Sequence, residues 1–244
     1  MYHFFKRSID LILSLLGLLV VLPLFLIVII ILKLTGEGEV FYLQERVGFN
    51  NKPFHIYKFA TMLKDSPNMG HKTVTVRNDP RITKVGRVLR MTKINELPQI
   101  LNVIKGDMAL VGPRPLLATS VVKYTPEVQE ILYKNKPGIT GIGSLVFRDE
   151  ELLVSTYREL GKDPMEYYKN HIYPYKGKLE TWYYHNCSLV VDFKILFLTF
   201  WSLVKPDSEL VFKRFKDLPR KPEVLTVAFL RLGEGARCEG ARER

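Results

Sequence analysis

Hydrophobic positions gather at the N-terminus of the chain. No charged side chain occurs from Leu11 to Leu32, and a lysine follows directly. About 20 apolar residues are needed for a helix to cross a bilayer, so this stretch predicts a membrane helix. A second apolar stretch, from Leu189 to Val204, contains an aspartate and a lysine. It is short for a span and predicts an interfacial helix.

Pro23 lies inside the first apolar stretch. Proline removes a backbone donor and clashes with the preceding turn, so it predicts a kink or a break in the helix. Two topologies follow: a kinked single span, or a helix that enters the membrane, breaks at Pro23 and returns to the same face. Lys6, Arg7 and Lys33 flank the stretch on both sides, so the positive-inside rule assigns no orientation. The hydrophobic pattern alone favours the span.

Between the two apolar stretches the pattern changes to short elements. Alternation predicts strands over Glu39–Gln44 and Lys52–Phe59, joined by the turn formers Gly48, Asn50 and Asn51. We expect helices and strands to alternate irregularly thereafter, which indicates an α+β fold. The further elements are a basic amphipathic helix over Ile82–Arg90, a helix over Glu96–Lys105 ended by Gly106, a strand over Met108–Val111, helices over Glu127–Lys134, Glu150–Leu160 and Pro164–Tyr184, and loops over Lys64–Pro80 and Lys136–Gly141.

Aromatic residues near the second apolar stretch suit the membrane interface, and we expect Trp182, Tyr183, Tyr184 and Trp201 to anchor it there. After Pro206 the composition becomes polar, and the last residues, GEGARCEGARER, predict disorder. The predicted organisation is a membrane segment over residues 1–36, a domain with interfacial helices over 37–206, and a partly disordered tail over 207–244.

The charge balance is strongly basic, with 36 Lys and Arg against 25 Asp and Glu and a net charge of +11. Such a balance favours polyanionic partners, namely nucleic acid, an anionic leaflet or phosphate-rich small molecules. No recognised nucleic-acid motif occurs, and the apolar N-terminus favours the membrane surface. The two cysteines stand at no metal-like spacing, which argues against a zinc site and fits a reducing compartment.

Candidate chemistry concentrates in the run NELPQILNVIKGDMALVGPRP, residues 95–115. Asn95 is placed to cap a helix, and Glu96 in its first turn is either a carboxylate facing the helix dipole or a Mg²⁺ ligand beside substrate phosphate. Arg114 stands between two prolines that limit its backbone freedom, which suits a bidentate grip on phosphate. Lys58 and Arg90 are further candidate phosphate-binding cations, each with the alternative of an ordinary solvated charge.

Three segments carry a resemblance to a known family. RVGFNNKPFHIYKFATM, DPRITKVGRVLRMTKINELPQILNVIKGDMALVGPRP and KPGITG resemble the bacterial sugar transferases, the monotopic polyprenyl-phosphate phosphoglycosyl transferases. The resemblance covers about residues 4–204. It implies a re-entrant helix broken at a proline, matched by Pro23, a small α/β catalytic part, and amphipathic helices on the cytoplasmic face of the bacterial inner membrane, against its anionic leaflet.

The resemblance also implies a reaction. A sugar phosphate moves from a UDP-sugar to undecaprenyl phosphate with release of UMP and with Mg²⁺ as cofactor, the first membrane step of capsule, O-antigen or glycoconjugate assembly. Glu96 matches the family's metal ligand and Arg114 its phosphate-binding arginine. The interfacial helices are compatible with a homodimer. The sequence specifies neither the sugar nor the oligomeric state.

Three features depart from the family pattern. Asn95 stands where the family has the aspartate that attacks phosphate, and Ala60 stands where we expect arginine. GIGSLVFRDEE follows KPGITG where we expect an aromatic-Gln stretch, and its acids Asp149, Glu150 and Glu151 are either a solvated acidic turn or substitutes for the missing carboxylate. A neutral amide is not that nucleophile. Two hypotheses follow: an active transferase, in which Glu96, another acid such as Asp149, Glu150 or Glu151, or the lipid phosphate itself attacks, and a non-catalytic membrane homologue that binds or scaffolds.

Overall fold

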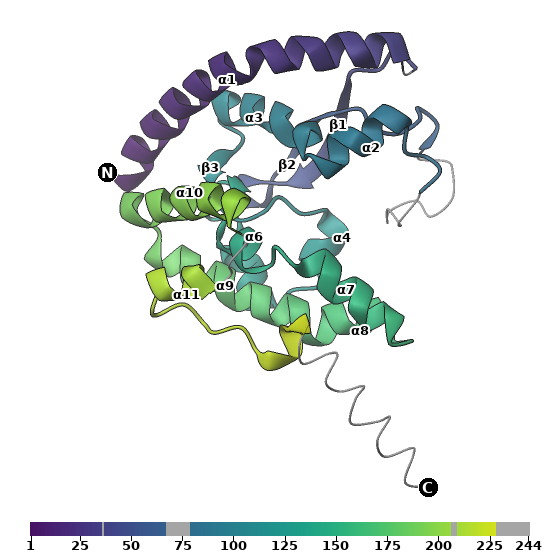
Figure 1. Cartoon of the computed structure of the whole chain (residues 1–244). Coiled ribbons are helices and arrows are strands. Elements are labelled where there is room, and N and C mark those ends of the chain that lie inside the picture. Colours follow the sequence, from purple (N-terminus) through teal and green to yellow (C-terminus); the bar gives the residue numbers. More distant parts are fainter. Residues whose placement is uncertain (36, 67–78, 206–208, 228–244) are drawn as a thin grey trace, which may run out of the picture. The chain divides into compact units, whose positions relative to one another are not determined.

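The computed structural model describes residues 1–35, 37–66, 79–205 and 209–227 of the chain (Figure 1). The chain divides into two compact units. The first comprises residues 1–46 and 53–110, and the second comprises residues 47–52 and the chain from 111 onward. Most of the predicted loop over Lys64–Pro80 and the predicted disordered end lie outside the described residues.

The long helix α1, Tyr2–Thr35, opens the first unit and confirms the predicted apolar helix. It is the one helix among the described residues that is long and apolar enough to cross a membrane. Pro23 lies inside it, and the helix continues through that residue as one arch (Figure 1). Large aliphatic side chains such as Leu19 and Val20 are exposed along it. The fold is therefore α+β with an apolar N-terminal helix, and re-entry of α1 into the membrane stays a prediction.

One stripe of α1 is buried and covers a small hairpin. The strands β1, Phe41–Val47, and β2, Pro53–Phe59, form a two-stranded sheet, close to the predicted positions. Phe25 of α1 packs edge-on against Phe59 of β2, with ring centroids 5.1 Å apart. The remaining members of this core are Val28, Leu32, Val40 and Leu89.

The N-terminal end of α1 is tied to α3, Ile100–Lys105. The guanidinium of Arg7 donates to the carbonyl oxygens of Val103 and Ile104 at 2.5 and 2.8 Å. These carbonyls belong to the last turn of α3, and that of Val103 also accepts the N–H of Gly106 at 3.0 Å. Arg7 adds a donor to each of them and holds the two helices together.

Asn102 joins α3 to the edge of β2. Its side-chain amide donates to the His55 carbonyl at 2.8 Å and accepts from the Tyr57 N–H at 3.0 Å, so it pairs with the strand as a neighbouring backbone would. The side chain is completely buried. The backbone carbonyl of Asn102 also accepts the N–H groups of the turn that follows, at Gly106, Asp107 and Met108.

The predicted helix over Glu96–Lys105 is divided. A 3₁₀-helix, η3, covers Ile94–Gln99 and passes directly into α3, which ends at the left-handed Gly106 as predicted. α2, Lys84–Met91, confirms the basic amphipathic helix. Only two residues separate α2 from η3, and the second, Lys93, is left-handed with φ of 60°. This short connection leaves no room for the predicted cap at Asn95, which lies inside η3.

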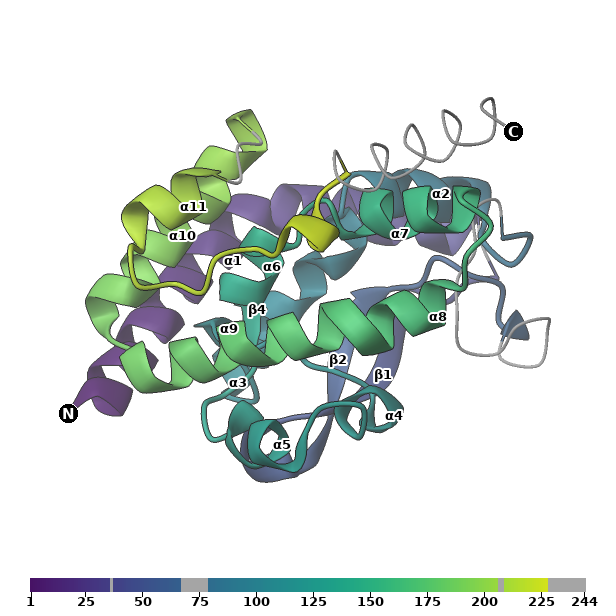
Figure 2. The ribbon, with the colours of Figure 1, turned by 90° about the horizontal axis from the view of Figure 1, so that it is seen from below.

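The second unit is built around a helical core. Its central rod consists of α8, Pro164–Tyr167, the π-helical turn η4, Tyr168–Ile172, and α9, Tyr173–Asn186, which follow one another in line (Figure 2). α10, Leu189–Val204, buries Ile195 and Leu198 and exposes an apolar stripe. The other helices are α4, Ala118–Val121, α5, Pro126–Leu132, α6, Ile142–Val146, α7, Glu150–Glu159, and α11, Glu209–Arg214.

The C-terminal strap, residues 215–225, closes this core and contains the short 3₁₀-helix η5, Glu223–Leu225. Phe215, Leu218 and Leu225 are buried in it. Side chains of the rod and of the α6–α7 connection bind the strap through four polar contacts: Trp182 Nε1 to Asp217 Oδ2 at 2.8 Å, Tyr175 Oη to the Pro219 carbonyl at 2.7 Å, Tyr167 Oη to the Val224 carbonyl at 2.8 Å, and Lys221 Nζ to Asp149 Oδ1 at 2.8 Å.

Two expectations for the second unit were wrong, and two short helices were missed. Trp182 and Tyr183 are buried core residues rather than interface anchors, and the Tyr183 hydroxyl donates to Asp192 at 2.7 Å. The predicted loop over Lys136–Gly141 contains β4, Gly138–Thr140, which pairs with β3, Ala109–Val111. The helices α4 and α6 were not predicted, because segments of four and five residues carry too little periodicity.

Replacing Asn102 with alanine removes both bonds to β2, so the Tyr57 N–H and the His55 carbonyl lose the partner that this buried side chain supplies. We expect the free energy of unfolding to fall by about 1–3 kcal/mol, measured by thermal or denaturant unfolding of the detergent-solubilised protein. Asn186→Ala, which removes an exposed side-chain bond within α9, is the matched control. Equal losses for the two variants would contradict this role of Asn102.

Candidate active site

Lys58 and Glu96 form the centre of the candidate site in the first unit. The ammonium of Lys58 on β2 lies 3.3 Å from Oε1 of Glu96 on η3. The side chains are 16% and 28% exposed, so the pair is partly shielded and still reachable from solvent. Two residues that are 38 positions apart are thus brought together because η3 packs on β2.

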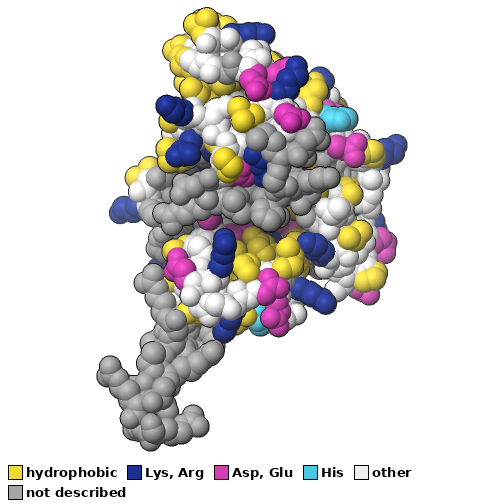
Figure 3. Space-filling model, turned by 90° about the vertical axis from the view of Figure 1, so that its right-hand side faces the viewer, with side chains coloured by type: hydrophobic (Ala, Val, Ile, Leu, Met, Phe, Trp, Pro, Cys, Tyr) yellow, Lys and Arg dark blue, Asp and Glu magenta, His cyan; other side chains and the backbone are white. Residues whose placement is uncertain are grey.

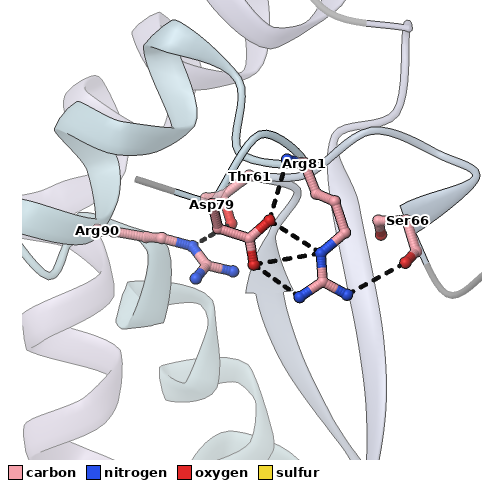
Figure 4. A network of polar contacts seen from close by, with 5 residues as sticks. All are labelled: Thr61, Ser66, Asp79, Arg81 and Arg90. Carbon is pink, nitrogen blue, oxygen red and sulfur yellow. Dashed lines mark hydrogen bonds and ion pairs between the residues drawn. The ribbon is translucent and has the colours of Figure 1, made fainter. Parts of the chain in front are cut away.

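A buried ion pair lies at the start of α2 (Figure 4). The Asp79 carboxylate accepts from the Arg81 guanidinium through both oxygens, at 2.6 to 3.2 Å, and from the Arg81 backbone N–H at 3.0 Å. Both side chains are almost completely buried. Bidentate pairing of this kind fixes the orientation of both groups.

Arg90, on the last turn of α2, is half-buried beside this pair. Its Nε–H donates to the Thr61 hydroxyl at 2.8 Å (Figure 4). Burial lowers the pKa of Arg90 from its ordinary value, and the charges of Asp79 and Glu96 oppose that effect. An arginine remains cationic at neutral pH under such conditions, so Arg90 places positive charge near Glu96.

Asn95 is buried next to Glu96, and its Oδ1 has no hydrogen-bond partner. Buried polar oxygens are normally satisfied, so this atom marks a place where a ligand or water would supply a donor or a cation. The predicted role as a helix cap was wrong, since no backbone N–H donates to it.

The donor set fits Mg²⁺ only in part. Among the described residues no group of three His, Cys, Asp or Glu side chains could hold a metal ion alone. Mg²⁺ is often held by one or two carboxylates together with phosphate oxygens of the substrate and water. Glu96, with the unsatisfied Asn95 oxygen beside it, fits that substrate-bridged mode.

Arg114 lies in the second unit, in the Gly112–Pro115 loop. Tyr133, which is completely buried, donates its hydroxyl to the Arg114 carbonyl at 2.9 Å and accepts from the Leu116 N–H at 2.8 Å. A Cβ on Gly112 would lie 2.2 Å from the Lys136 carbonyl oxygen, so only glycine allows this loop to pack against the KPGITG segment. The two motifs form one rigid platform for Arg114.

The other candidate acids are held by lysines in the second unit. Lys176 binds both oxygens of Glu150 at 2.8 and 2.7 Å, and Lys221 binds both oxygens of Asp149 at 2.8 and 2.9 Å. Asp149 and Glu150 are therefore each held in an ion pair rather than solvated freely. No such contact is described for Glu151.

Each unit contains a cavity among its described residues. One of about 540 Å³ lies between α5 and α9 and is lined mainly by apolar surface, and one of about 240 Å³ lies beside Ala60 in the first unit. None of the predicted site residues lines either cavity. On the face shown in Figure 3, basic and acidic side chains are interspersed, so the net positive charge is not gathered there into one patch.

Comparison with known proteins matches the family model "Bacterial sugar transferase" to residues 1–206. The chain belongs to the bacterial sugar transferase family. The resemblance seen in the three motifs is thereby confirmed.

Several relatives within the bacterial sugar transferase family have assigned names. UDP-N-acetylgalactosamine-undecaprenyl-phosphate N-acetylgalactosaminephosphotransferase of Aeromonas hydrophila is 40% identical over 147 residues, 59% of this chain and 34% of that protein. The exopolysaccharide production protein ExoY of Sinorhizobium fredii is 33% identical over 208 residues, 80% of this chain and 83% of that protein. Undecaprenyl-phosphate galactose phosphotransferase of Salmonella typhimurium is 33% identical over 220 residues, 84% of this chain and 41% of that protein.

The chain thus spans about a third of the Aeromonas protein and most of ExoY. Bacterial sugar transferases are associated with membranes, in agreement with the exposed apolar surface of α1. The family match ends at residue 206, whereas the C-terminal strap lies beyond it.

Sequence reasoning found Lys58, Arg90, Asn95 and Glu96, and all four lie in the first unit. It missed residues that support the site: Thr61, Asp79, Arg81 and Tyr133. Thr61, Asp79 and Arg81 belong to the segments that resemble the family, so their place in those motifs could have marked them as site residues. Nothing in the sequence distinguishes Tyr133, since a tyrosine at the end of a short helix is common.

Tyr133→Phe removes the hydroxyl that joins Arg114 to Leu116. We expect the free energy of unfolding to fall by about 1–2 kcal/mol, because the Leu116 N–H and the Arg114 carbonyl each lose a partly buried hydrogen bond. Denaturant unfolding measures this change. Tyr42→Phe removes a hydroxyl from an exposed tyrosine and should change stability by less than about 0.5 kcal/mol. A similar, small effect at both positions would contradict the role of the Tyr133 hydroxyl in joining Arg114 to Leu116.

Proposed function

We propose that this chain transfers a sugar phosphate from a UDP-sugar to undecaprenyl phosphate. The observation that carries the proposal is the Lys58–Glu96 pair, 3.3 Å apart beside Arg90, within a chain related to proteins named for this transfer. The phosphoanhydride bond of the donor breaks, UMP leaves, and a new phosphoanhydride joins the sugar phosphate to the lipid phosphate.

Each residue has a distinct task in this proposal. Glu96 would hold Mg²⁺, which neutralises charge on the diphosphate when it is bound. Lys58 and Arg90 would orient the phosphates by hydrogen bonds and charge. Arg114, in the second unit, is a separate candidate for binding phosphate, on the basis of its resemblance to the phosphate-binding arginine of the family. Positioning and charge stabilisation account for most of phosphoryl transfer catalysis, which suits such a set.

The reaction would take place on the cytoplasmic face of the bacterial inner membrane. α10 supports this placement, because it exposes an apolar stripe with a lysine near its end: Val190, Phe193, Phe197, Phe200, Trp201 and Val204, with Lys205 against the Trp201 ring. A helix of this kind lies in the interface with its apolar face toward the acyl chains. The net charge of +11 favours an anionic leaflet.

The attacking group in this proposal is the lipid phosphate itself. Asn95 carries a neutral amide, which is a poor nucleophile toward phosphate. Asp149 and Glu150 are each bound by a lysine, which makes them poor substitutes. A phosphate oxygen of the acceptor attacks the sugar-bearing phosphorus in line with the leaving UMP, without a covalent enzyme intermediate.

Native protein with undecaprenyl phosphate, Mg²⁺ and a panel of UDP-sugars should release UMP and form no covalent phosphosugar adduct. Asn95→Asp should form that adduct, detected with donor carrying labelled phosphate, because it supplies the carboxylate that the family uses. Asn186→Asp, at an exposed position, is the control and should form none. No UMP release from native protein, with Asn95→Asp active, would show that the chain is a non-catalytic homologue.

Glu96→Gln should lower Mg²⁺-dependent UMP release by roughly a hundredfold or more, because a neutral amide binds the ion weakly and leaves the diphosphate charge uncompensated. Glu130→Gln, which removes an exposed carboxylate paired with Lys134, should change the rate little. Rates measured across Mg²⁺ concentrations make the comparison. An unchanged Mg²⁺ dependence in Glu96→Gln would remove this residue from the metal site.

A further inference from the structure

Thr61 contacts both ends of α2. Its carbonyl accepts the backbone N–H of Thr83, the N-cap of the helix, at 3.1 Å, and its hydroxyl accepts the Nε–H of Arg90, in the last turn, at 2.8 Å. Thr61 is itself buried, at 6% exposure. One residue just after β2 thus sets both the position of α2 along its axis and its rotation.

Gly86 allows α2 to pack closely against the backbone of Thr61. A Cβ at this position would lie 2.1 Å from the Thr61 carbonyl oxygen, a distance that no side chain allows. The Gly86 N–H is capped by the Thr83 hydroxyl at 2.9 Å, which completes the first turn. Arg90 follows Gly86 by four residues and therefore lies on the same face of the helix, above Thr61.

The buried Asp79–Arg81 pair lies beside this contact. Figure 4 shows the Asp79 carboxylate between the guanidinium groups of Arg81 and Arg90. Arg81 is also within reach of the Ser66 carbonyl, at 3.4 Å. The Asp79–Arg81 pair thus bounds one side of the Arg90 guanidinium, and the Nε bond to Thr61 fixes the plane of that group.

We propose that Thr61 is a positioning residue that aims Arg90 at the diphosphate of the donor. It acts through Arg90 and has no contact with substrate of its own. A planar guanidinium recognises phosphate through a rigid fork of N–H groups, so its value depends on the orientation of that plane. This inference rests on the proposed function, since it assigns the diphosphate as the group that Arg90 meets.

Thr61→Val keeps the shape of the side chain and removes the hydroxyl. We expect the KM for the UDP-sugar and the Kd for UDP with Mg²⁺ to rise roughly tenfold, and kcat to change less than about threefold. Thr61→Ser restores the hydroxyl and should stay within about twofold of native. Thr92→Val is the matched control, because the Thr92 hydroxyl bonds only to backbone carbonyls of α2.

A double variant separates positioning from a general structural effect. Thr61→Val combined with Arg90→Gln should be no weaker in UDP binding than Arg90→Gln alone, because no guanidinium remains to be aimed. Additive losses, or equal UDP binding by native protein and Thr61→Val, would overturn the proposal. If Thr61→Val does not fold, as judged by its melting temperature, Arg90→Lys tests the same bond and should show the same tenfold rise.

The two proposals fail in different ways. Absence of UDP binding and of UMP release in both the native protein and Asn95→Asp would overturn the proposed function and, with it, the role of Thr61. UDP binding that is intact in native protein and insensitive to Thr61 overturns only the positioning role.

Discussion

The Lys58–Glu96 pair depends on how Asn102 fastens α3 to the edge of β2. The Asn102 side chain makes two hydrogen bonds to the backbone of β2 and so holds α3 beside this strand. Because η3 runs directly into α3, it must then lie over β2. A buried amide whose N–H and C=O groups are both hydrogen-bonded allows only one arrangement of its partners, whereas apolar packing tolerates several. The position of Glu96 is therefore fixed by a residue six positions further along the chain.

The charged side chains around Glu96 in the first unit carry a net positive charge, which favours the binding of an anion. The described cluster holds three cations, Lys58, Arg81 and Arg90, against two carboxylates, Asp79 and Glu96. Bidentate pairing within Asp79–Arg81 restrains the two most deeply buried charges, as a low-dielectric setting requires. Lys58 and Glu96 lie nearer to solvent, where a diphosphate and its metal ion could reach them.

Much of this could be predicted from the sequence, and the failures have physical causes. The apolar stretch, the hairpin and α2 were predictable because each carries a strong periodicity or a long hydrophobic run. Asn95 was expected to cap a helix, yet its side-chain type cannot reveal that the left-handed Lys93 starts the 3₁₀-helix earlier. Trp182 was expected at the membrane interface. This expectation failed because a segment beyond residue 206 covers the side chain, which the sequence does not reveal. Lys58 was found as a candidate, but its partner 38 residues away was set by tertiary packing.

The C-terminal strap has a consequence for the order in which the protein is made. Translation proceeds from the N-terminus, so the apolar helix α1 leaves the ribosome before either unit is complete and can meet the membrane early. The rod formed by α8 and α9 emerges with Tyr167, Tyr175 and Trp182 still lacking the groups that they bind in the finished unit. Those groups arrive only with residues 215–225. The second unit must therefore complete its core only after residues 215–225 have been synthesised, whereas the residues of the first unit are all available earlier.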